Sequence, residues 1–365
     1  MSNRIGNHVV LTLFGESHGP AIGGVLDGMP AGIKVDFEEI QAMLEKRRAV
    51  GAISTSRKEE DIPEFLSGLK DGYTEGTSIA FVICNTNRHS KDYESLKHIA
   101  RPGHADYTGH IHYCGFEDPA GGGHFSGRLT AVMTVAGALC MSYLKDRGIT
   151  IGTHIASLHG IPDRPFDFSH CKQEIALLNE KIFAVLDETK EEQMKAEILA
   201  ARQAQDSVGG ILETVVDGLE PGLGEPEFDS VESMLAHAMF SIPAVKGIEF
   251  GEGFQFANLY GHEANDPFCM EDGHVVTTTN HNGGINGGIT NGMPVVFRTV
   301  LKPTPSIARP QKTVNFETME NTEITIQGRH DPAVIHRARV VVDAMTALTC
   351  MDLLVERYGL LGERK

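Results

Sequence analysis

The feature that most constrains the fold is a short motif that occurs twice in the chain. Ile22-Gly-Gly-Val-Leu leads into Asp27-Gly-Met-Pro-Ala-Gly, and Val208-Gly-Gly-Ile-Leu leads into Asp217-Gly-Leu-Glu-Pro-Gly. Each copy has the pattern of a strand followed by a tight turn rich in Gly and Pro. Two copies indicate two similar halves, because a solenoid needs three repeats or more. We therefore expect a pseudo-symmetric α+β core.

Helical patterns occupy five stretches of the chain, at residues 36–48, 129–144, 172–205, 230–240 and 332–358. In the first stretch, Asp36 and Glu39 resemble a capping box. The second has 16 residues without a charge, fewer than the roughly 20 that span a bilayer, so we expect a buried helix. The last has Asp331 as a candidate N-cap, Pro332 at its first position and Gly359 just past its end.

Strand-like runs lie between these helices, at residues 9–14, 79–83, 210–216, 275–279, 294–299 and 323–326. They do not alternate regularly with the helices, which disfavours a doubly wound parallel sheet. No linker rich in Pro or Ser divides the sequence. We therefore expect a single domain over residues 1–365.

The charge balance limits the classes of partner. Lys and Arg total 32 against 49 Asp and Glu, so the formal net charge is −17. A general nucleic-acid binder or a protein of anionic membrane surfaces needs a basic face, so neither is expected. If the ligand is an anion, local arginine clusters must overcome the overall negative field.

The cysteines and the N-terminus indicate a reduced, cytoplasmic setting. Six cysteines, at positions 84, 114, 140, 171, 269 and 350, lie far apart without paired spacing, so neither a disulfide framework nor a zinc site is expected. Metal ligation has little support, because His110-Ile-His112 is the only close histidine pair and no H-E-x-x-H helix occurs. The first residues lack the apolar core of a signal peptide.

Glycine is over-represented and points to loops that approach a ligand. Forty of the 365 residues are glycine, about 11 % against a usual share of about 7 %. No G-x-G-x-x-G follows a strand, which disfavours a Rossmann dinucleotide site. The stretch from Gly122 imitates a P-loop, but Arg128 and Leu129 stand where that loop needs Lys and Ser or Thr, which excludes a nucleotide hydrolase of that type.

Three segments that contain glycine are candidates for catalysis: Gly15-Glu-Ser-His-Gly19, Arg101-Pro-Gly-His-Ala-Asp106 and Gly328-Arg-His-Asp-Pro332. Histidine in such a loop can act as a general acid toward a ligand. Each segment also has a purely structural interpretation, as a turn, a surface loop and a helix N-cap respectively.

Two further stretches suit a ligand that bears a phosphate. Residues 282–292 contain five glycines, which lets backbone N–H groups reach an anion. Lys302-Pro-Thr-Pro-Ser306 offers an ammonium group and two hydroxyls on a stiffened loop. Ordinary turns are the alternative interpretation of both.

Taken in this order, the segments resemble the chorismate synthase family from about Gly6 to Met351. The family's marks are the three candidate segments, Asp27-Gly-Met-Pro30, Gly121-Gly-Gly-His-Phe-Ser-Gly-Arg128, Ser241-Ile-Pro-Ala-Val-Lys-Gly247, Gly287-Gly-Ile and Lys302-Pro-Thr-Pro-Ser306. Several such segments in the family's order make a chance resemblance very improbable.

The resemblance implies a lyase that converts 5-enolpyruvylshikimate 3-phosphate to chorismate and phosphate by 1,4-elimination, a step toward the aromatic amino acids. It implies a β-α-β sandwich, a homotetramer and a requirement for reduced FMN without net redox change. NADPH enters only if the protein reduces its own flavin; otherwise a separate flavin reductase is implied.

The resemblance also assigns residues. His18, Ser17, His104 and Asp331 correspond to catalytic positions. Arginines that match the family's substrate-binding positions are Arg47, Arg48, Arg101, Arg128 and Arg337. Positions that match FMN contacts are His124, Phe125, Ser126, Gly287, Lys302, Pro303, Thr304, Pro305, Ser306 and Arg329. Guanidinium groups suit the phosphate and two carboxylates of such a substrate, because they form paired hydrogen bonds with them.

The chain departs from the family pattern at a few positions. His124 and Phe125 replace a common Arg-Ser pair beside the flavin. The loop at 49–56 is shorter than usual and lacks an arginine, with Arg57 nearby. His336 and Asp343 stand where Pro and Glu are common, and neither is given a function here.

Two other classes of protein remain as alternatives. A flavin-dependent oxidoreductase would use the same FMN site but transfer a net hydride from a nicotinamide. A scaffold that has kept the fold and lost catalysis would be expected to lack at least one of His18, His104 and Asp331, and all three are present.

Overall fold

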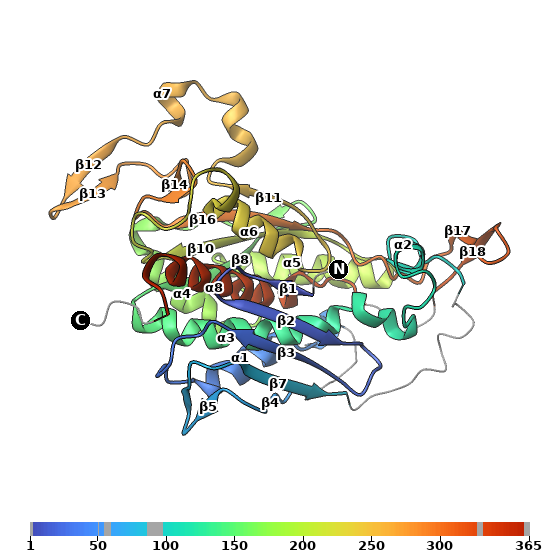
Figure 1. Ribbon diagram of the computed structural model, residues 1–365. Helices are drawn as coiled ribbons and strands as arrows, with labels where there is room; N and C mark the ends of the chain where they lie inside the picture. Colours follow the sequence, from blue (N-terminus) through green and yellow to red (C-terminus); the bar gives the residue numbers. More distant parts are fainter. Residues whose placement is uncertain (1–2, 50, 55–59, 86–97, 327–330, 361–365) are drawn as a thin grey trace.

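The computed structural model describes residues 3–49, 51–54, 60–85, 98–326 and 331–360. In this part of the chain, two antiparallel five-stranded sheets enclose a layer of helices (Figure 1). The first sheet has the order β1 (Arg4–Ile5), β2 (Val10–Gly15), β3 (Ala21–Asp27), β7 (Ile79–Cys84), β4 (Glu64–Phe65). The second has the order β11 (Val245–Phe250), β16 (Val295–Leu301), β10 (Gly210–Asp217), β8 (Thr150–Leu158), β9 (Ile161–Pro162). This is an α+β sandwich, as expected.

The repeated sequence motif forms the middle strand of each sheet. β3 pairs with β2 and β7, and β10 pairs with β8 and β16, so each has a neighbour on both sides. Their turns contain Gly28 and Gly218, both with positive φ. The repeat therefore marks equivalent places in the two halves.

The middle layer consists of α1 (Phe37–Arg47), α3 (Thr130–Asp146), α6 (Val231–Phe240) and α8 (Ile335–Tyr358). α3 and α8 approach closely at Gly137, where an added Cβ would lie 2.3 Å from the Ala344 Cα. The segment Gly127–Asp146 is long and apolar enough to cross a membrane, but 89 % of its most apolar window is buried inside the protein. It is a core helix, as its uncharged sequence predicts.

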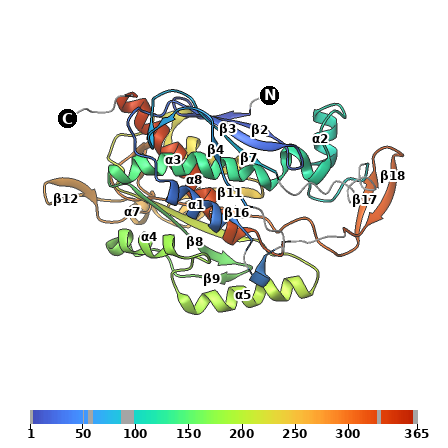
Figure 2. The same cartoon turned by 90° about the horizontal axis from the view of Figure 1, so that it is seen from below.

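Two helices pack against the second sheet, the first on its outer face and the second beside its edge strand β9 (Figure 2). They are α4 (Cys171–Glu180) and α5 (Glu188–Gln203), each a part of the expected stretch 172–205. Ile175 and Leu178 of α4 join a separate apolar cluster with Val215 and Val296 of the sheet. The central strands β8 and β10 are therefore buried on both faces over most of their length.

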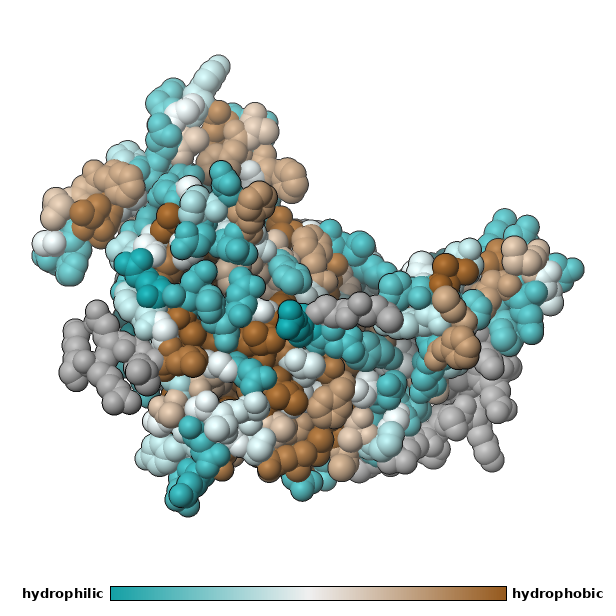
Figure 3. Space-filling model, viewed as in Figure 1, coloured by the Kyte–Doolittle hydropathy of each residue, from teal (hydrophilic) through white to brown (hydrophobic). Residues whose placement is uncertain are grey.

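The remaining elements are short. They are α2 (Asp106–His112), α7 (Gly261–Ala264), the strand pairs β5 (Leu69–Lys70) with β6 (Tyr73–Thr74), β12 (Phe268–Glu271) with β13 (His274–Thr277), β14 (Ile285–Asn286) with β15 (Ile289–Thr290), β17 (Gln311–Asn315) with β18 (Glu320–Ile324), and 3₁₀ helices at Gly51–Ile53, Ala120–Phe125, Gly127–Leu129, Phe168–His170, Glu227–Asp229 and Gly253–Asn258. The segment with α7 and β12–β13 projects from the body and exposes Phe254, Tyr260, Phe268 and Met270 (Figures 1 and 3).

The start of the last helix differs from the expectation. α8 begins at Ile335 with Val334 before it, so Asp331 is not its N-cap and Pro332 is not its first residue. The Pro332 carbonyl instead accepts a hydrogen bond from the Val208 N–H at 2.9 Å. This contact fixes the segment before α8 in a non-helical path. Gly359 follows the helix with φ 72°, as predicted.

Candidate active site

Most of the segments that the sequence singles out meet in one cleft of about 1060 Å³. Its wall comes from the end of α1, the loops around residues 101–106, 117–130, 240–246 and 302–306, and residues 331–341. The predicted site residues that line it are Arg47, Arg101, His104, His124, Phe125, Ser126, Arg128, Lys302, Thr304, Pro305, Ser306, Asp331 and Arg337. The fold thus brings both sheets and the helix layer to one site.

Arg47 and Arg128 converge on one carboxylate beneath the cleft. Arg47 Nη2 donates to Asp61 Oδ2 at 2.6 Å, and Arg128 Nη1 donates to Asp61 Oδ1. All three residues are buried, and Asp61 is fully so. Burial by itself raises the pKa of Asp61, but the two guanidinium charges outweigh it and hold that pKa below its usual range. Asp61 is therefore ionised between two fixed cations.

A chain of hydrogen bonds joins this cluster to the loop that bears His18. Arg128 Nε donates to Asn85 Oδ1 at 3.1 Å. The Asn85 amide in turn donates to the carbonyls of Glu16 and Gly19 at 3.0 and 2.9 Å. Because these two carbonyls flank Ser17 and His18, the position of the turn is tied to the position of Arg128.

Ser17 and His18 lie behind the glycine loop at 121–123. The Ser17 N–H donates to the Gly123 carbonyl at 3.1 Å, and its hydroxyl is buried without a hydrogen-bond partner among the described residues. His18 packs on Gly121: a Cβ there would lie 1.9 Å from His18 Cε1. Gly121 lines the cleft, so His18 borders the cleft across a residue that has no side chain.

Asp331 lines the cleft and pairs with Arg337, whose Nη1 donates to its carboxylate. Arg337 Nε donates to the Arg47 carbonyl at 2.8 Å. Asp331, which the sequence suggested as a helix cap, is thus an ion-pair partner within the cleft wall. The polar network runs without a break from the His18 turn through Asp61 to Asp331.

Two loops about 200 residues apart in sequence are joined at the cleft. His104 Nε2 and Ser306 Oγ lie 2.7 Å apart, and Lys302 Nζ donates to the Gly103 carbonyl at 2.7 Å. Arg101 donates to both carboxylate oxygens of Asp106, at 2.8 Å from Nε and 2.7 Å from Nη2. Burial raises the pKa of Asp106, but these Arg101 contacts keep it below its usual range. The histidine loop is therefore fixed from both ends.

His124 and Phe125, where the chain departs from the family pattern, both line the cleft. His124 Nδ1 lies 2.9 Å from the Gly15 carbonyl, which can only accept, so this nitrogen carries the proton. The Phe125 ring packs against Gly109 of α2 and lies 6.0 Å from the Tyr113 ring. The pair thus ties the cleft wall to the His18 turn and to α2.

Some of the predicted residues do not line the cleft. Arg48 pairs loosely with Glu45 on α1 at 3.9 Å. Gly287 forms the turn between β14 and β15, and Pro303 is not part of the wall although its neighbours are. Arg329 and Arg57 lie outside the described residues.

Sequence reasoning did not single out Asp61 or Asn85. Asp61 follows a run of charged residues and precedes Ile62-Pro63, the local pattern of an exposed loop. A usable signal was indirect: two buried arginines need a carboxylate nearby, because an unpaired buried charge is costly. The sequence does not state which of the 49 acidic residues would supply it.

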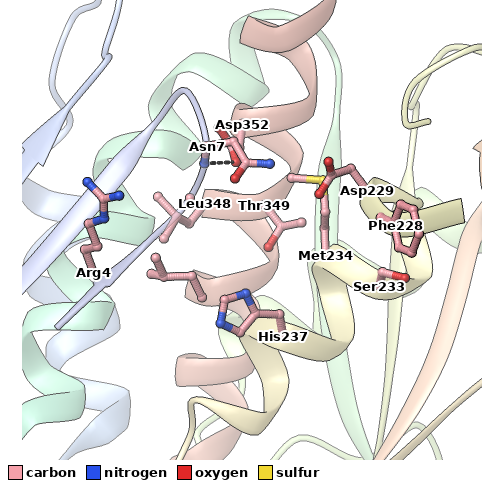
Figure 4. Close-up of a pocket in the computed structure, with 12 residues that line it drawn as sticks. Arg4, Asn7, Phe228, Asp229, Ser233, Met234, His237, Leu348, Thr349 and Asp352 are labelled. Carbon is pink, nitrogen blue, oxygen red and sulfur yellow. Dashed lines mark hydrogen bonds between the residues drawn. The ribbon is translucent and has the colours of Figure 1, made fainter. Parts of the chain in front are cut away.

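A second cavity of about 370 Å³ lies between the N-terminal strand, α6 and α8 (Figure 4). It is lined by Arg4, Asn7, His237 and Asp352 among others, and by none of the predicted site residues. The Asp352 carboxylate accepts hydrogen bonds from the N–H groups of residues 7, 8 and 9 at 2.6–2.8 Å. It fastens the start of the chain to the last helix.

Comparison with known proteins gives consistent matches over almost the whole chain. The family model described as chorismate synthase matches residues 9–355. A chorismate synthase of Dehalococcoides mccartyi is 44 % identical over 362 residues, 99 % of this chain and 98 % of that protein. One of Pyrococcus abyssi is 46 % identical over 352 residues, 96 % of this chain and 97 % of that protein. A crystal structure of chorismate synthase matches with a TM-score of 0.77 and 28 % identity, over 97 % of this chain and 94 % of that one.

Proposed function

The chain belongs to the chorismate synthase family and is a lyase of aromatic amino-acid biosynthesis, and we propose that its reaction takes place in the cleft described above. In this reaction 5-enolpyruvylshikimate 3-phosphate loses phosphate and a ring proton, and a carbon–carbon double bond forms. The observation that carries the proposal is the polar network that runs from the turn bearing His18 through the arginine pair to Asp331.

The cleft has donors and apolar walls that fit a reduced flavin, which we propose to be FMN. The Thr304 hydroxyl is buried without a partner among the described residues, and Lys302 brings a cation to the same loop. Phe125, Ile242 and Val245 give this wall an apolar surface. When bound, the reduced flavin supplies the electron-rich ring system that the family requires although the reaction has no net redox change. Of the other predicted contacts, Ser126, Pro305 and Ser306 also line the cleft, whereas Gly287 and Pro303 do not.

The arginines would bind the substrate's phosphate and two carboxylates. Arg47, Arg101, Arg128 and Arg337 line one cleft in a chain with a net charge of −17. Buried guanidinium groups act on a bound anion at short range. The field of surface charges that lie more than roughly 10 Å away is screened by salt. These four arginines thus supply local positive charge for an anionic substrate in a chain with a negative net charge.

The remaining side chains have proposed roles in moving protons. His18, protonated, would stabilise the departing phosphate, and the Ser17 hydroxyl, which has no partner among the described residues, would donate a hydrogen bond beside it. His104, oriented by Ser306, would hold a proton next to the flavin. Asp331, oriented by Arg337, would take part in removing the ring proton.

At the level of the whole protein, we propose a cytoplasmic homotetramer whose protomers are single domains over residues 1–365, as the family resemblance implies. Four chains of 39.6 kDa give a mass of 4 × 39.6 = 158.4 kDa, which light scattering of the eluting protein can check.

The test of the proposed function is an anaerobic assay of phosphate release from 5-enolpyruvylshikimate 3-phosphate. Turnover is expected with dithionite-reduced FMN and not without flavin, which separates the lyase from a phosphatase. Phosphate release that ignores flavin would contradict the proposal. A second arm with NADPH and oxidised FMN tests whether the protein reduces its own flavin or depends on a separate reductase.

Asp331→Asn tests the assigned carboxylate in the same assay. Asn keeps an acceptor for Arg337 but cannot hold a proton as a carboxylate does. Turnover is expected to fall by about 10²-fold or more with a thermal midpoint close to that of the parent. Normal turnover would remove Asp331 from the mechanism.

A further inference from the structure

Asp61 is the one carboxylate that contacts both Arg47 and Arg128 among the described residues, and it has no exposed surface of its own. It uses one oxygen for each guanidinium group. Because no part of Asp61 reaches the cleft, a ligand in the cleft cannot touch it. Any effect of Asp61 on the reaction must pass through the two arginines.

The geometry leaves the cluster with an excess of positive charge in a fixed arrangement. Two guanidinium groups held by one carboxylate carry a net charge of +1, whereas one carboxylate for each arginine would leave none. Without a shared carboxylate, two buried like charges would repel and each would lack a partner, which is strongly destabilising. The Arg47 Nε is buried without a hydrogen-bond partner among the described residues, so donor capacity remains.

We propose that Asp61 is a positioning residue for the lyase reaction: it fixes Arg47 and Arg128 in the arrangement that receives the anionic groups of the substrate, without contacting the substrate. This rests on the proposed use of the cleft. The arrangement exists before the ligand arrives, so binding does not have to order two long side chains. Preorganisation of this kind increases affinity by lowering the entropic cost of binding.

The test compares Asp61→Asn with the parent protein. An amide presents one acceptor and one N–H₂ donor, and the donor faces a guanidinium group, so Asn can hold at most one of the two arginines. We expect the Kd for 5-enolpyruvylshikimate 3-phosphate, measured by calorimetry with oxidised flavin so that no turnover occurs, to rise about tenfold. This corresponds to about 1.4 kcal/mol. The kcat at saturating substrate should stay within about threefold, because a role in binding alone raises KM and spares kcat.

A matched control is Asp352→Asn. Asp352 is equally buried and accepts three backbone N–H bonds far from the cleft. It should lower the thermal midpoint and leave the substrate Kd within twofold. If both variants changed the Kd alike, the effect of Asp61 would be one of general stability, and the proposal would fail.

A double-mutant cycle tests whether Asp61 acts through the arginines. Because they share a contact, Asp61→Asn and Arg128→Ala should together raise the Kd by less than the product of their separate effects. Strictly multiplicative effects would overturn the proposal, as would an unchanged Kd or a fall in kcat at constant Kd.

Asp61→Glu decides the matter if the Asn variant does not fold. It keeps the charge and moves the carboxylate by one methylene group, so the Kd should rise while the protein stays folded. A parental Kd would mean that the position of this carboxylate is not critical. The parent protein, run in the anaerobic assay, separates these outcomes from a failure of the proposed function, in which the parent itself would release no phosphate.

Discussion

Gly121 shows how a single residue without a side chain can set the position of His18, the proposed catalytic group. Its φ is 62°, and an added Cβ would lie 1.9 Å from His18 Cε1, far inside van der Waals contact. A side chain at this position must therefore displace the imidazole ring. The requirement is steric as well as conformational.

Gly121→Ala should lower turnover by about tenfold or more, the order expected when a general acid is moved out of place. The matched control is Gly122→Ala. Gly122 has a similar positive φ of 85°, but the nearest atom to a Cβ added there is the Ser126 Cβ at 3.9 Å. Both variants have the strain of alanine at a positive φ, but only the Gly121→Ala side chain clashes with His18. Equal turnover in the two would refute a steric role for Gly121.

His336 is buried one residue before Arg337, with its Nε2 2.7 Å from Ser54 Oγ and its ring stacked on Phe183. Burial, and then the charge of Arg337, lower its pKa to about 3. In the unfolded chain the pKa of histidine is about 6.5. Below that pH the unfolded state binds a proton that the folded state does not. The contribution of His336 to the free energy of unfolding is therefore fully present above about pH 6.5 and is lost as the pH falls toward 3.

His336→Gln keeps a partner for Ser54 and removes this titration. Between pH 7.5 and 5.5 the parent should lose about 1.4 kcal/mol more of its free energy of unfolding than the variant does, the value for one proton taken up only by the unfolded state. Urea unfolding at the two pH values measures the difference. The buried carboxyl of Asp343, whose pKa burial raises to about 6, contributes equally to both proteins and cancels. Parallel pH curves would contradict the assignment to His336.

At the scale of the elements, the contact between α3 and α8 depends on Gly137. Its φ is not positive, so the constraint is purely the closeness of Ala344. Gly137→Ala should lower the free energy of unfolding by about 1–3 kcal/mol, the usual cost of overpacking a core. Gly127→Ala serves as the control, because nothing lies within 4 Å of its added Cβ. A Gly137→Ala protein as stable as the control would mean that the helices can separate freely.

Elements with a clear apolar pattern were predictable, and those stabilised by buried polar pairs were not. The uncharged run at 129–144 forms α3, and the repeated motif forms β3 and β10. β8 was missed because its polar residues are inside: Thr153 contacts Asp343 at 2.6 Å, and His154 lies between Asp163 and Glu213 at 2.8 and 3.2 Å. Such pairs satisfy polar groups only once the fold exists, so hydrophobic periodicity does not report them.

For the whole molecule, the main apolar core is continuous from the first sheet through the helix layer to the second sheet. Ile22 of β3 and Leu212 of β10 belong to the same cluster. We therefore expect one cooperative thermal transition, since no part of this core can be lost without exposing the rest. Calorimetry of the parent and of Gly137→Ala should show one peak that shifts as a whole. Two peaks, of which only one shifts, would mean that the halves unfold separately.

The sequence predicted the loops that form the candidate site, but not the hydrogen bonds and ion pairs that connect them. His104 and Asp331 stood out as chemistry-bearing residues in segments that contain glycine, and both line the cleft. Asp61 and Asn85 did not, because their importance lies in which distant side chains they touch. Arg48 has the same residue type as Arg47 but points to Glu45 instead. Arg47 is the last residue of α1 and Arg48 already has an extended backbone, so the two side chains face different directions, which sequence proximity alone does not resolve.

The position of α8 has a consequence for how the protein is made. This helix occupies the middle layer, and its Asp352 holds residues 7–9, yet it is made after all the other described helices and strands. At roughly 5–20 residues per second, the first sheet, whose last strand ends at Cys84, waits for tens of seconds before α8 begins to be made at Ile335. The nascent chain therefore cannot complete its core before α8 has been made. The hydrogen bonds of residues 7–9 can form only once Asp352, more than 340 residues later, has been added.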